Sequence, residues 1–137
     1  HCRLGWLIKT SEYNAATRTR DAMSLHAASL DLEVSLLSGG NQQKVAIGKW
    51  LETQPDLLML DEPTRGIDVG AKQQIYDLIE QWKSEGLSIL LSTSEIPELM
   101  LLSARIYVMH SGSVSAEFNR DTASPEKIME AAMGARQ

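Results

Sequence analysis

The sequence predicts an α/β fold, and three consecutive segments carry that prediction. Residues 57–60 and 88–93 are short runs with apolar centres, and residues 71–83 lie between them. In the middle segment the apolar residues recur at i, i+3, i+4 and i+7, which is the period of an amphipathic helix. Short unbroken apolar runs are typical of strands that are covered on both faces of a parallel sheet. Strand, helix and strand in this order predict a parallel, right-handed βαβ unit.

Two further helices are predicted before this unit. Residues 13–30 are rich in alanine and show a loosely helical spacing of apolar residues, and residues 41–53 carry an apolar face that ends before Pro55. Residues 31–37 are interpreted as a connector. The apolar residues that define the two faces are Ala15, Met23, Ala27 and Leu30 in the first helix and Ile47, Trp50 and Leu51 in the second.

The βαβ unit contains the clearest amphipathic helix of the chain. Gly86 stands where a glycine commonly follows the end of a helix. Pro97 suits the first turn of a short helix that reaches about Leu102. The residues expected to face inward from helix 71–83 are Ile75, Leu78, Ile79 and Trp82.

A β-hairpin and a last helix are predicted near the C-terminus. The β-like runs 105–109 and 113–118 are separated by residues 110–112, which end in glycine. Ser124 opens the last helix and Gly134 closes it. The residues expected to face inward from this helix are Ile128, Met129, Ala132 and Met133.

Composition bounds the class of protein. The 137 residues are 43% hydrophobic and 23% charged, which is ordinary for a globular domain. The net charge of −5 argues against a dedicated nucleic-acid binder, which usually carries a basic face. Cys2 is the only cysteine, so no intrachain disulfide forms and a reducing compartment is expected. No apolar run approaches the roughly 18 residues of a membrane span. The chain does not begin with Met, so we expect it to be a piece of a longer protein.

The first motif with chemical meaning is the stretch Leu-Ser-Gly-Gly-Asn-Gln-Gln-Lys at residues 37–44. Ser38 is placed to cap the helix that follows. Gly39 and Gly40 lack a Cβ, so backbone N–H groups there can approach a ligand closely. The N-terminus of a helix suits a phosphate because its free N–H groups and its dipole both favour an anion. The alternative interpretation is a tight turn before a helix.

The second motif is an acidic pair at the end of the first predicted strand. Asp61 and Glu62 follow the apolar run 57–60, and ligands of open α/β sheets bind at this end of the strands. Asp61 is a candidate Mg²⁺ ligand, directly or through water, because Mg²⁺ prefers hard oxygen ligands and keeps several waters. Glu62 is a candidate to orient or polarise an attacking water. The alternative is two exposed acids at a strand end.

Together the two motifs resemble the ABC ATPase family. Residues 37–44 are similar to its signature, residues 57–64 to its Walker B motif, and residues 65–68 to its D-loop, in the family's order and spacing. The resemblance implies a P-loop NTPase (ABC ATPase) fold. Residues 1–36 are then a remnant of the helical subdomain, and residues 37–137 form the C-terminal part of the ATPase core. The form GNQQK followed by DEPTRGIDVGAK looks like the second nucleotide-binding half of the sugar-importing subgroup (ribose, xylose or galactose type).

The resemblance assigns roles to individual residues. The signature residues that it places at the γ-phosphate of an ATP held by another half are Ser38, Gly39, Gly40, Asn41 and Gln42. By the same resemblance Glu62 is the catalytic acid of a second, weak or silent site, and Asp61 serves Mg²⁺ there. Asp68 is the D-loop acid at the interface between halves, or the N-cap of the following helix, or both. Ser94 stands where most members have a switch histidine.

No P-loop string, Gly-x₄-Gly-Lys-Ser/Thr, occurs in the 137 residues, and the stretch 66–72 is only a near miss. We therefore expect the chain alone to bind ATP very weakly and not to hydrolyse it. Trp50 and Trp82 are predicted to be core residues. His26 and His110 lack the spacing of a metal site.

The resemblance also implies partners and a location. The expected partners are the other nucleotide-binding half, transmembrane permease subunits and, indirectly, a periplasmic sugar-binding protein, and no nucleic acid. The expected location is cytoplasmic, peripheral on the inner face of the cell membrane, with ATP and Mg²⁺ bound only in the complete assembly. The alternatives are a non-catalytic module that docks on a complete ATPase half, and a non-transport ABC ATPase acting on DNA or ribosomes.

Overall fold

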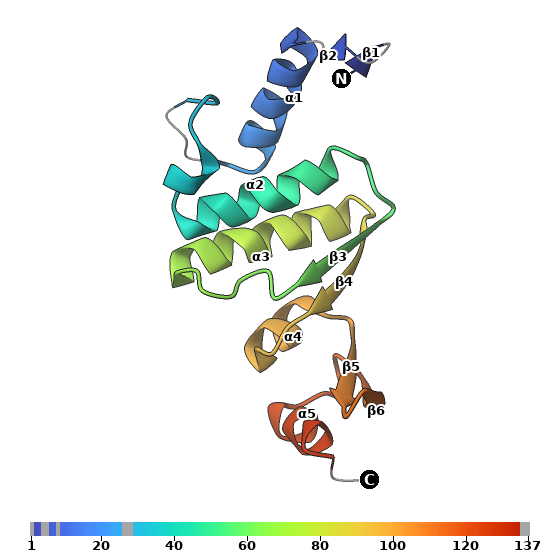
Figure 1. The fold of residues 1–137 in the computed structure, drawn as a ribbon. Helices are drawn as coiled ribbons and strands as arrows, with labels where there is room; N and C mark the ends of the chain where they lie inside the picture. Colours follow the sequence, from blue (N-terminus) through green and yellow to red (C-terminus); the bar gives the residue numbers. More distant parts are fainter. Residues whose placement is uncertain (1, 4–5, 8, 26–28, 135–137) are drawn as a thin grey trace. The chain divides into compact units, whose positions relative to one another are not determined.

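The computed structural model describes residues 2–3, 6–7, 9–25 and 29–134, and it has an α/β fold (Figure 1). The chain divides into two compact units, which are described separately. The first comprises His1–Leu58 and Pro63–Ile89, and the second Met59–Glu62 and Leu90–Gln137. The elements in chain order are β1 (Cys2–Arg3), β2 (Trp6–Leu7), α1 (Lys9–Ala22), the 3₁₀ helix η1 (Val34–Leu36), α2 (Gly39–Leu51), β3 (Leu57–Asp61), α3 (Val69–Ser84), β4 (Ser88–Ser92), α4 (Ile96–Leu102), β5 (Arg105–His110), β6 (Ser113–Asn119) and α5 (Pro125–Ala132).

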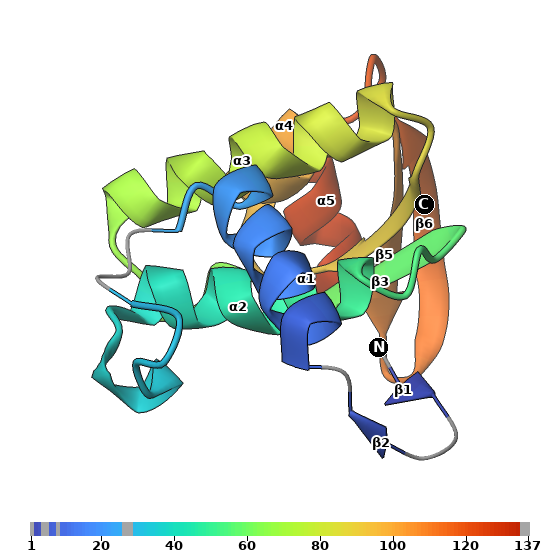
Figure 2. The ribbon, with the colours of Figure 1, turned by 90° about the horizontal axis from the view of Figure 1, so that it is seen from above.

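The first unit is built on helix packing around α2. Helix α2 contacts both α1 and α3, and α2 and α3 run side by side in the same direction (Figure 1, Figure 2). Close approach of α1 and α2 depends on Gly48, where an added Cβ would lie 2.6 Å from Thr19 Cγ2 and 3.3 Å from Met23 Cγ. The buried apolar residues of this unit are Ala15, Met23, Ile47, Leu58, Ile75, Leu78, Ile79 and Trp82. The inward face predicted for the helix of the βαβ unit is thereby confirmed.

The first helix differs from the predicted range of 13–30. Helix α1 begins at Lys9 and ends at Ala22, because Ser24 adopts a left-handed φ of 47° and the Leu25 amide donates to the carbonyl oxygen of Arg20. This 6→1 bond is typical of a helix C-terminus. Ala27 and His26 lie outside the described residues. The predicted connector 31–37 contains the short helix η1.

The two tryptophans predicted to be core residues have different environments. Trp82 is 7% exposed, as predicted, whereas Trp50 is 60% exposed, so the prediction for Trp50 is wrong. Helix α2 buries Gly40, Lys44, Ile47 and Gly48. At 3.6 residues per turn, Trp50 points about 100° away from the centre of that face. The Lys49 ammonium lies 5.6 Å from the centre of its ring, which is a surface cation–π contact.

The strands β3 and β4 form a two-stranded sheet. The Ser88 amide donates to the backbone carbonyl oxygen of Asp56 at 3.2 Å, and the Glu62 amide donates to that of Ser92 at 2.7 Å. The start of β3 thus lies beside the start of β4, and the end beside the end, so the strands run parallel, as predicted. Coverage of both faces was also expected, and that prediction is wrong. Leu58 is buried, but Met59 is 68% exposed, because no element within the described part of the chain covers that face.

The second unit contains the predicted hairpin of β5 and β6. Ile106 pairs with Phe118 and His110 with Ser113, and a bulge follows Val108. The two-residue turn between the strands, Ser111 and Gly112, has positive φ at both positions, 49° and 78°. This is the pattern of a type I′ turn, whose twist matches that of a hairpin.

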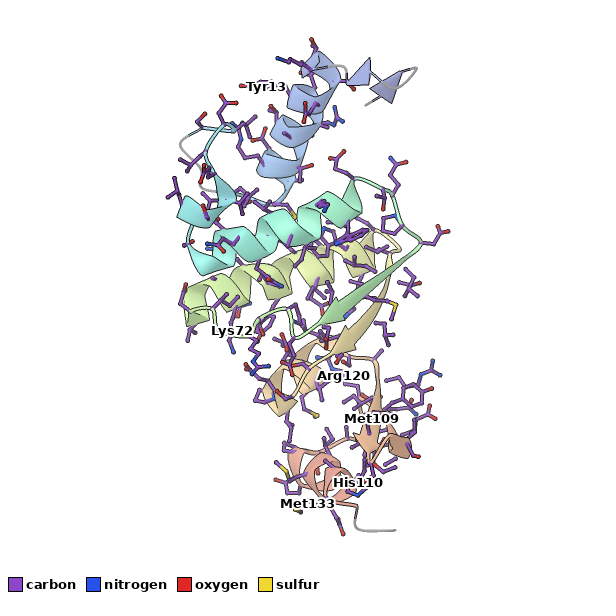
Figure 3. All side chains as sticks on the ribbon, viewed as in Figure 1. Tyr13, Lys72, Met109, His110, Arg120 and Met133 are labelled. Carbon is purple, nitrogen blue, oxygen red and sulfur yellow. The ribbon has the colours of Figure 1, made fainter. Side chains whose placement is uncertain are left out.

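Helix α5 packs against this hairpin through a face that differs in part from the predicted one. Ile128 and Ala131 are buried with Ile106 and Val108, whereas Met129 and Met133 are 50% and 69% exposed. Ala132 is exposed as well, so three of the four residues expected to face inward do not. The buried face is centred between Ile128 and Ala131, and at 3.6 residues per turn Met129 and Met133 point more than about 100° away from it. The end of α5 is also bonded to the hairpin through its carbonyl groups. Ser115 Oγ donates to Ala131, and His110 Nδ1 lies 2.9 Å from the Ala132 carbonyl oxygen, where Figure 3 shows His110 beside α5.

Among the described residues no helix combines the length and the apolar character that a membrane span requires.

Replacing Gly48 by Ala tests the packing of α1 on α2. Because the new Cβ would lie 2.6 Å from Thr19 Cγ2, we expect the free energy of unfolding to fall by about 1–3 kcal/mol, although Ala is the better helix former. The matched control is Gly39→Ala in the same helix, where the nearest atom, Ile67 Cγ2, is 3.7 Å away. Urea unfolding measures both variants. Equal effects would contradict the packing argument.

Candidate functional site

The N-terminus of α2 carries the first predicted group of site residues. Ser38 occupies the N-cap position with extended φ and ψ of −61° and 154°. Its side chain makes no capping bond; instead, Asn41 Nδ2 donates to Ser38 Oγ at 3.1 Å. The first turn of α2 contains no acidic residue. The helix therefore presents its positive end with no carboxylate of its own first turn to neutralise it.

The two glycines of this loop serve different purposes. Gly39 is exposed, and the nearest atom to an added Cβ would be 3.7 Å away, so its backbone has open space beside it; close approach of a ligand there stays a prediction. Gly40 is buried, and an added Cβ would lie 2.4 Å from the Cβ of Ala71 in α3. The missing side chain of Gly40 is thus required for the contact between α2 and α3. Gln42 turns back on the loop, since its Nε2 donates to the carbonyl oxygen of Leu37 at 2.8 Å.

Asp68 caps the neighbouring helix α3. Its Oδ1 accepts a hydrogen bond from the Ala71 amide at 2.9 Å, which confirms the N-cap alternative for this residue. Its role as a D-loop acid stays a prediction. The positive end of α3 is therefore already matched by a carboxylate, whereas that of α2 is not.

A cleft joins these two helix ends within the first unit. Its volume is about 220 Å³, below the roughly 300–1,000 Å³ of typical ligand pockets, so it suits a phosphoryl group better than a whole nucleotide. Ser38 and Asn41 from the predicted signature and Asp68 from the predicted D-loop meet here. The lining residues are Ser38, Gly40, Asn41, Asp68, Gly70, Ala71 and Gln74.

Lys44, the last residue of the signature stretch, is buried beside this cleft with 1% of its surface exposed. Its Nζ donates to Gln74 Oε1 at 2.7 Å and to the Ser24 carbonyl oxygen at 3.2 Å. Burial lowers the pKa of Lys44 below its ordinary value, because the charged form loses hydration. Sequence reasoning assigned Lys44 no role of its own, and the only available signal was its i+4 spacing from Gly40.

The acidic pair lies in the second unit at the end of β3. Asp61 Oδ1 accepts a hydrogen bond from Ser92 Oγ at 2.8 Å, and Glu62 Oε1 accepts one from the Ser94 amide at 3.0 Å. The structure thus brings Asp61, Glu62 and Ser94 together, and Ser94 contacts Glu62 through its backbone N–H. The sequence indicates Ser94 only as the residue at the position of a switch histidine. Ser92 was missed, although it ends the strand that neighbours Asp61.

The backbone conformation of Glu62 determines the direction of its carboxylate. Its φ of 45° lies in the left-handed region, which costs a non-glycine residue roughly 1–2 kcal/mol. The Glu62 amide donates to the Ser92 carbonyl oxygen at 2.7 Å, so the turn is fixed by the neighbouring strand. Strained backbone maintained by its surroundings is a recurring feature of functional sites.

The donor set at Asp61 fits a magnesium ion in part. The Asp61 carboxylate and the Ser92 hydroxyl provide hard oxygens at an exposed strand end. Mg²⁺ in such sites is coordinated by one or two carboxylates, by substrate phosphates and by several waters. One carboxylate is therefore enough as the ligand supplied by the protein. Within the described ranges, His, Cys, Asp and Glu form no cluster of three or more suited to a metal.

Asp68 and Ser38 occupy the same N-cap position in neighbouring helices but should differ in their effect on stability. Asp68→Ala removes a capping bond, so we expect the free energy of unfolding to fall by about 1 kcal/mol. Ser38→Ala removes no capping bond, and we expect a change within about 0.5 kcal/mol. Urea unfolding at neutral pH measures both. A larger loss for Ser38→Ala than for Asp68→Ala would contradict the assignment.

The lowered pKa of Lys44 predicts a rise of stability with pH. Between that lowered pKa and the ordinary value of 10.5, the unfolded chain binds more protons than the folded chain. The free energy of unfolding therefore increases as the pH rises through this window. We expect Lys44→Met to lose this increase and Lys49→Met, at an exposed position of the same helix, to retain it. Urea unfolding of the three proteins from pH 8 upward measures the difference, and parallel curves would contradict the prediction.

Comparison with known proteins agrees with the motifs and with the fold. Residues 8–65 match the model of the ABC transporter family, a range that contains the predicted signature and the acidic pair. Among solved structures, the ATP-binding cassette MJ1267 of an ABC transporter superposes with a TM-score of 0.78 at 26% identity, over 92% of this chain and 52% of the cassette. The dimeric bacterial ABC transporter cassette MJ0796 gives 0.74 at 24% identity, over 86% of this chain and 51% of that one.

A more distant relative shows the same fold. A putative metal-chelate type ABC transporter in an inward-facing conformation gives a TM-score of 0.83 at 18% identity, over 98% of this chain and 53% of that one. The chain thus spans about half the length of the structures it matches. It has the P-loop NTPase fold of ABC ATPase cassettes.

Proposed function

We propose that this chain is the part of an ABC-type transport ATPase that contributes a signature loop in trans to an ATP held by another nucleotide-binding half. The observation that carries the proposal is the positive end of α2, which has no acidic residue in its first turn and where the exposed Ser38 lines a cleft of phosphoryl size. An anion is favoured at such a helix end by the backbone N–H groups and by the dipole.

The contacts of Ser38 support a γ-phosphate as the bound group. Its Oγ accepts a hydrogen bond from Asn41, so its own proton is directed elsewhere and can be donated to a phosphate oxygen. Gln42 fixes the loop that precedes the helix through the Leu37 carbonyl. The Asp68 carboxylate is engaged with the start of α3, which leaves α2 as the helix end that attracts the phosphate.

The acidic pair is proposed to serve a second site, completed by a phosphate-binding loop outside these 137 residues. In this proposal Asp61 would hold Mg²⁺ directly or through water, and a bound ion would supply positive charge beside a phosphate. Glu62 orients the attacking water and is itself aligned by the Ser94 amide. The serine at position 94 supplies no cationic charge there, so we propose that this second site is the weaker one.

The sugar-importing subgroup is proposed on the sequence forms GNQQK and DEPTRGIDVGAK. The proposal includes the permease subunits and the periplasmic sugar-binding protein as partners and the inner face of the cell membrane as the location. The cassette MJ0796 is dimeric, also in a post-hydrolysis state bound to ADP and Pi, which supports a pairing of two halves around nucleotide.

Two substitutions in the complete transporter ATPase test the proposed asymmetry. Ser38→Arg places a bulky cation in the cleft, and we expect it to lower the ATP turnover rate by about 100-fold or more. Glu62→Gln should leave turnover within about threefold, because the second site contributes little. Steady-state ATPase rates measure both, and equal losses would remove the asymmetry.

Calorimetry on the 137-residue chain separates this proposal from the alternative of a non-catalytic docking module. ATP binding should be undetectable at sub-millimolar nucleotide, since the chain lacks the string that cradles the phosphates. A complete ATPase half loaded with ATP should bind the chain, and Ser38→Arg should prevent it. A docking module would bind that half whether or not ATP is present.

A further inference from the structure

Beyond the residues that face the cleft, one buried side chain joins the two helices that form it. Lys44 of α2 donates to Gln74 Oε1 of α3 at 2.7 Å, and Gln74 also lines the cleft. The Gly40–Ala71 contact lies four residues before Lys44 in α2 and three residues before Gln74 in α3. The helices therefore touch at two successive turns along the same direction, first by close packing and then by a hydrogen bond.

The same ammonium also reaches the end of α1. It donates to the carbonyl oxygen of Ser24, the residue whose left-handed backbone terminates that helix. A cation at a helix C-terminus satisfies carbonyl groups that lack an intrahelical partner. Lys44 of α2 thus bonds both to α3 and to the segment that ends α1, with 1% of its surface exposed.

Packing alone does not explain a lysine at this position. Burying an ammonium is costly, and Met would fill a similar volume without that cost. An apolar contact would also allow α2 to slide along α3, because dispersion forces are not directional. Hydrogen bonds to two fixed acceptors are directional, so together with the Gly40–Ala71 contact they set both the axial register of α2 and its angle to α3.

We infer that Lys44 is a positioning residue, which couples α2 to α3 through Gln74 and so sets the distance between Ser38 and Asp68 across the cleft. This inference rests on the proposed function of the cleft in ATP turnover. An ammonium only donates hydrogen bonds, so Oε1 of Gln74 must face Lys44, and the orientation of the amide is fixed as well. Loss of Lys44 would leave the signature loop folded but misplaced.

The test uses three variants. Lys44→Met removes the hydrogen bond between Lys44 and Gln74. The double variant Lys44→Met/Gln74→Leu replaces both side chains by apolar ones of similar size, so that neither position carries a buried polar group without a partner. The matched control is Lys49→Met, at an exposed position on the same helix. The angle between α2 and α3 is measured by residual dipolar couplings of the 137-residue chain. Turnover is measured in the complete ATPase.

We expect the double variant to remain folded with the angle between α2 and α3 changed by about 10°. We expect its kcat to fall about tenfold or more with little change in KM for ATP, since a displaced signature loop affects the reaction more than nucleotide binding. Lys49→Met should match the wild type in both measurements. A folded double variant that keeps either the wild-type angle or the wild-type kcat would overturn the inference.

Failure of the proposed function can be recognised separately. If Ser38→Arg leaves turnover intact in the complete ATPase, the signature role is wrong. The positioning role of Lys44 in turnover then falls with it, whereas an altered angle between the helices would still establish the structural coupling. If Ser38→Arg abolishes turnover and the double variant does not reduce it, only the inference about Lys44 is wrong.

Discussion

The contact between Gly40 and Ala71 is the constraint on which the candidate phosphate site depends. A Cβ at position 40 would lie 2.4 Å from that of Ala71, so the two helices can approach this closely only because residue 40 has no side chain. The approach brings the start of α2 beside the start of α3, and the cleft between them contains Ser38 and Asp68. A glycine that sequence reasoning assigned to ligand approach thus acts mainly through helix packing.

Two helix N-termini at one cleft would compete for the same anion if they were equivalent. One carboxylate distinguishes the two helix ends. Asp68 accepts a hydrogen bond from the Ala71 amide and so caps α3, whereas Ser38 accepts one from the Asn41 side chain and does not cap α2. The Asp68 carboxylate interacts favourably with the positive end of the α3 dipole, whereas the positive end of the α2 dipole has no such group in its first turn and is available to a ligand. Asp68 therefore leaves the N-terminus of α2 as the helix end that an anion in this cleft would favour.

Sequence periodicity predicted those parts of the fold whose partners lie within the chain. The spacing from Ile75 to Trp82 identified a helix face that the structure buries, and the hairpin followed from its turn residues. The same reasoning was wrong for Trp50 and Met59, because an apolar residue in a sequence does not reveal which element, if any, covers it. At the site, residue types indicated Asp61 and Glu62. Their partners Ser92 and the Ser94 amide were beyond prediction, because neighbouring strands meet only in three dimensions.

The two groups of site residues are fixed by different forces, which has a consequence for how each tolerates change. The signature end of α2 is set by close packing at Gly40 and by a buried ammonium at Lys44, where any added or removed volume shifts a helix. The acids are set by hydrogen bonds from the end of β4, and Glu62 also adopts a left-handed backbone that this strand stabilises. Hydrogen-bond donors at a strand end can be exchanged without moving the strand, whereas helix packing allows little adjustment. We therefore expect the donors around the acidic pair to tolerate single substitutions better than the close packing at Gly40 does.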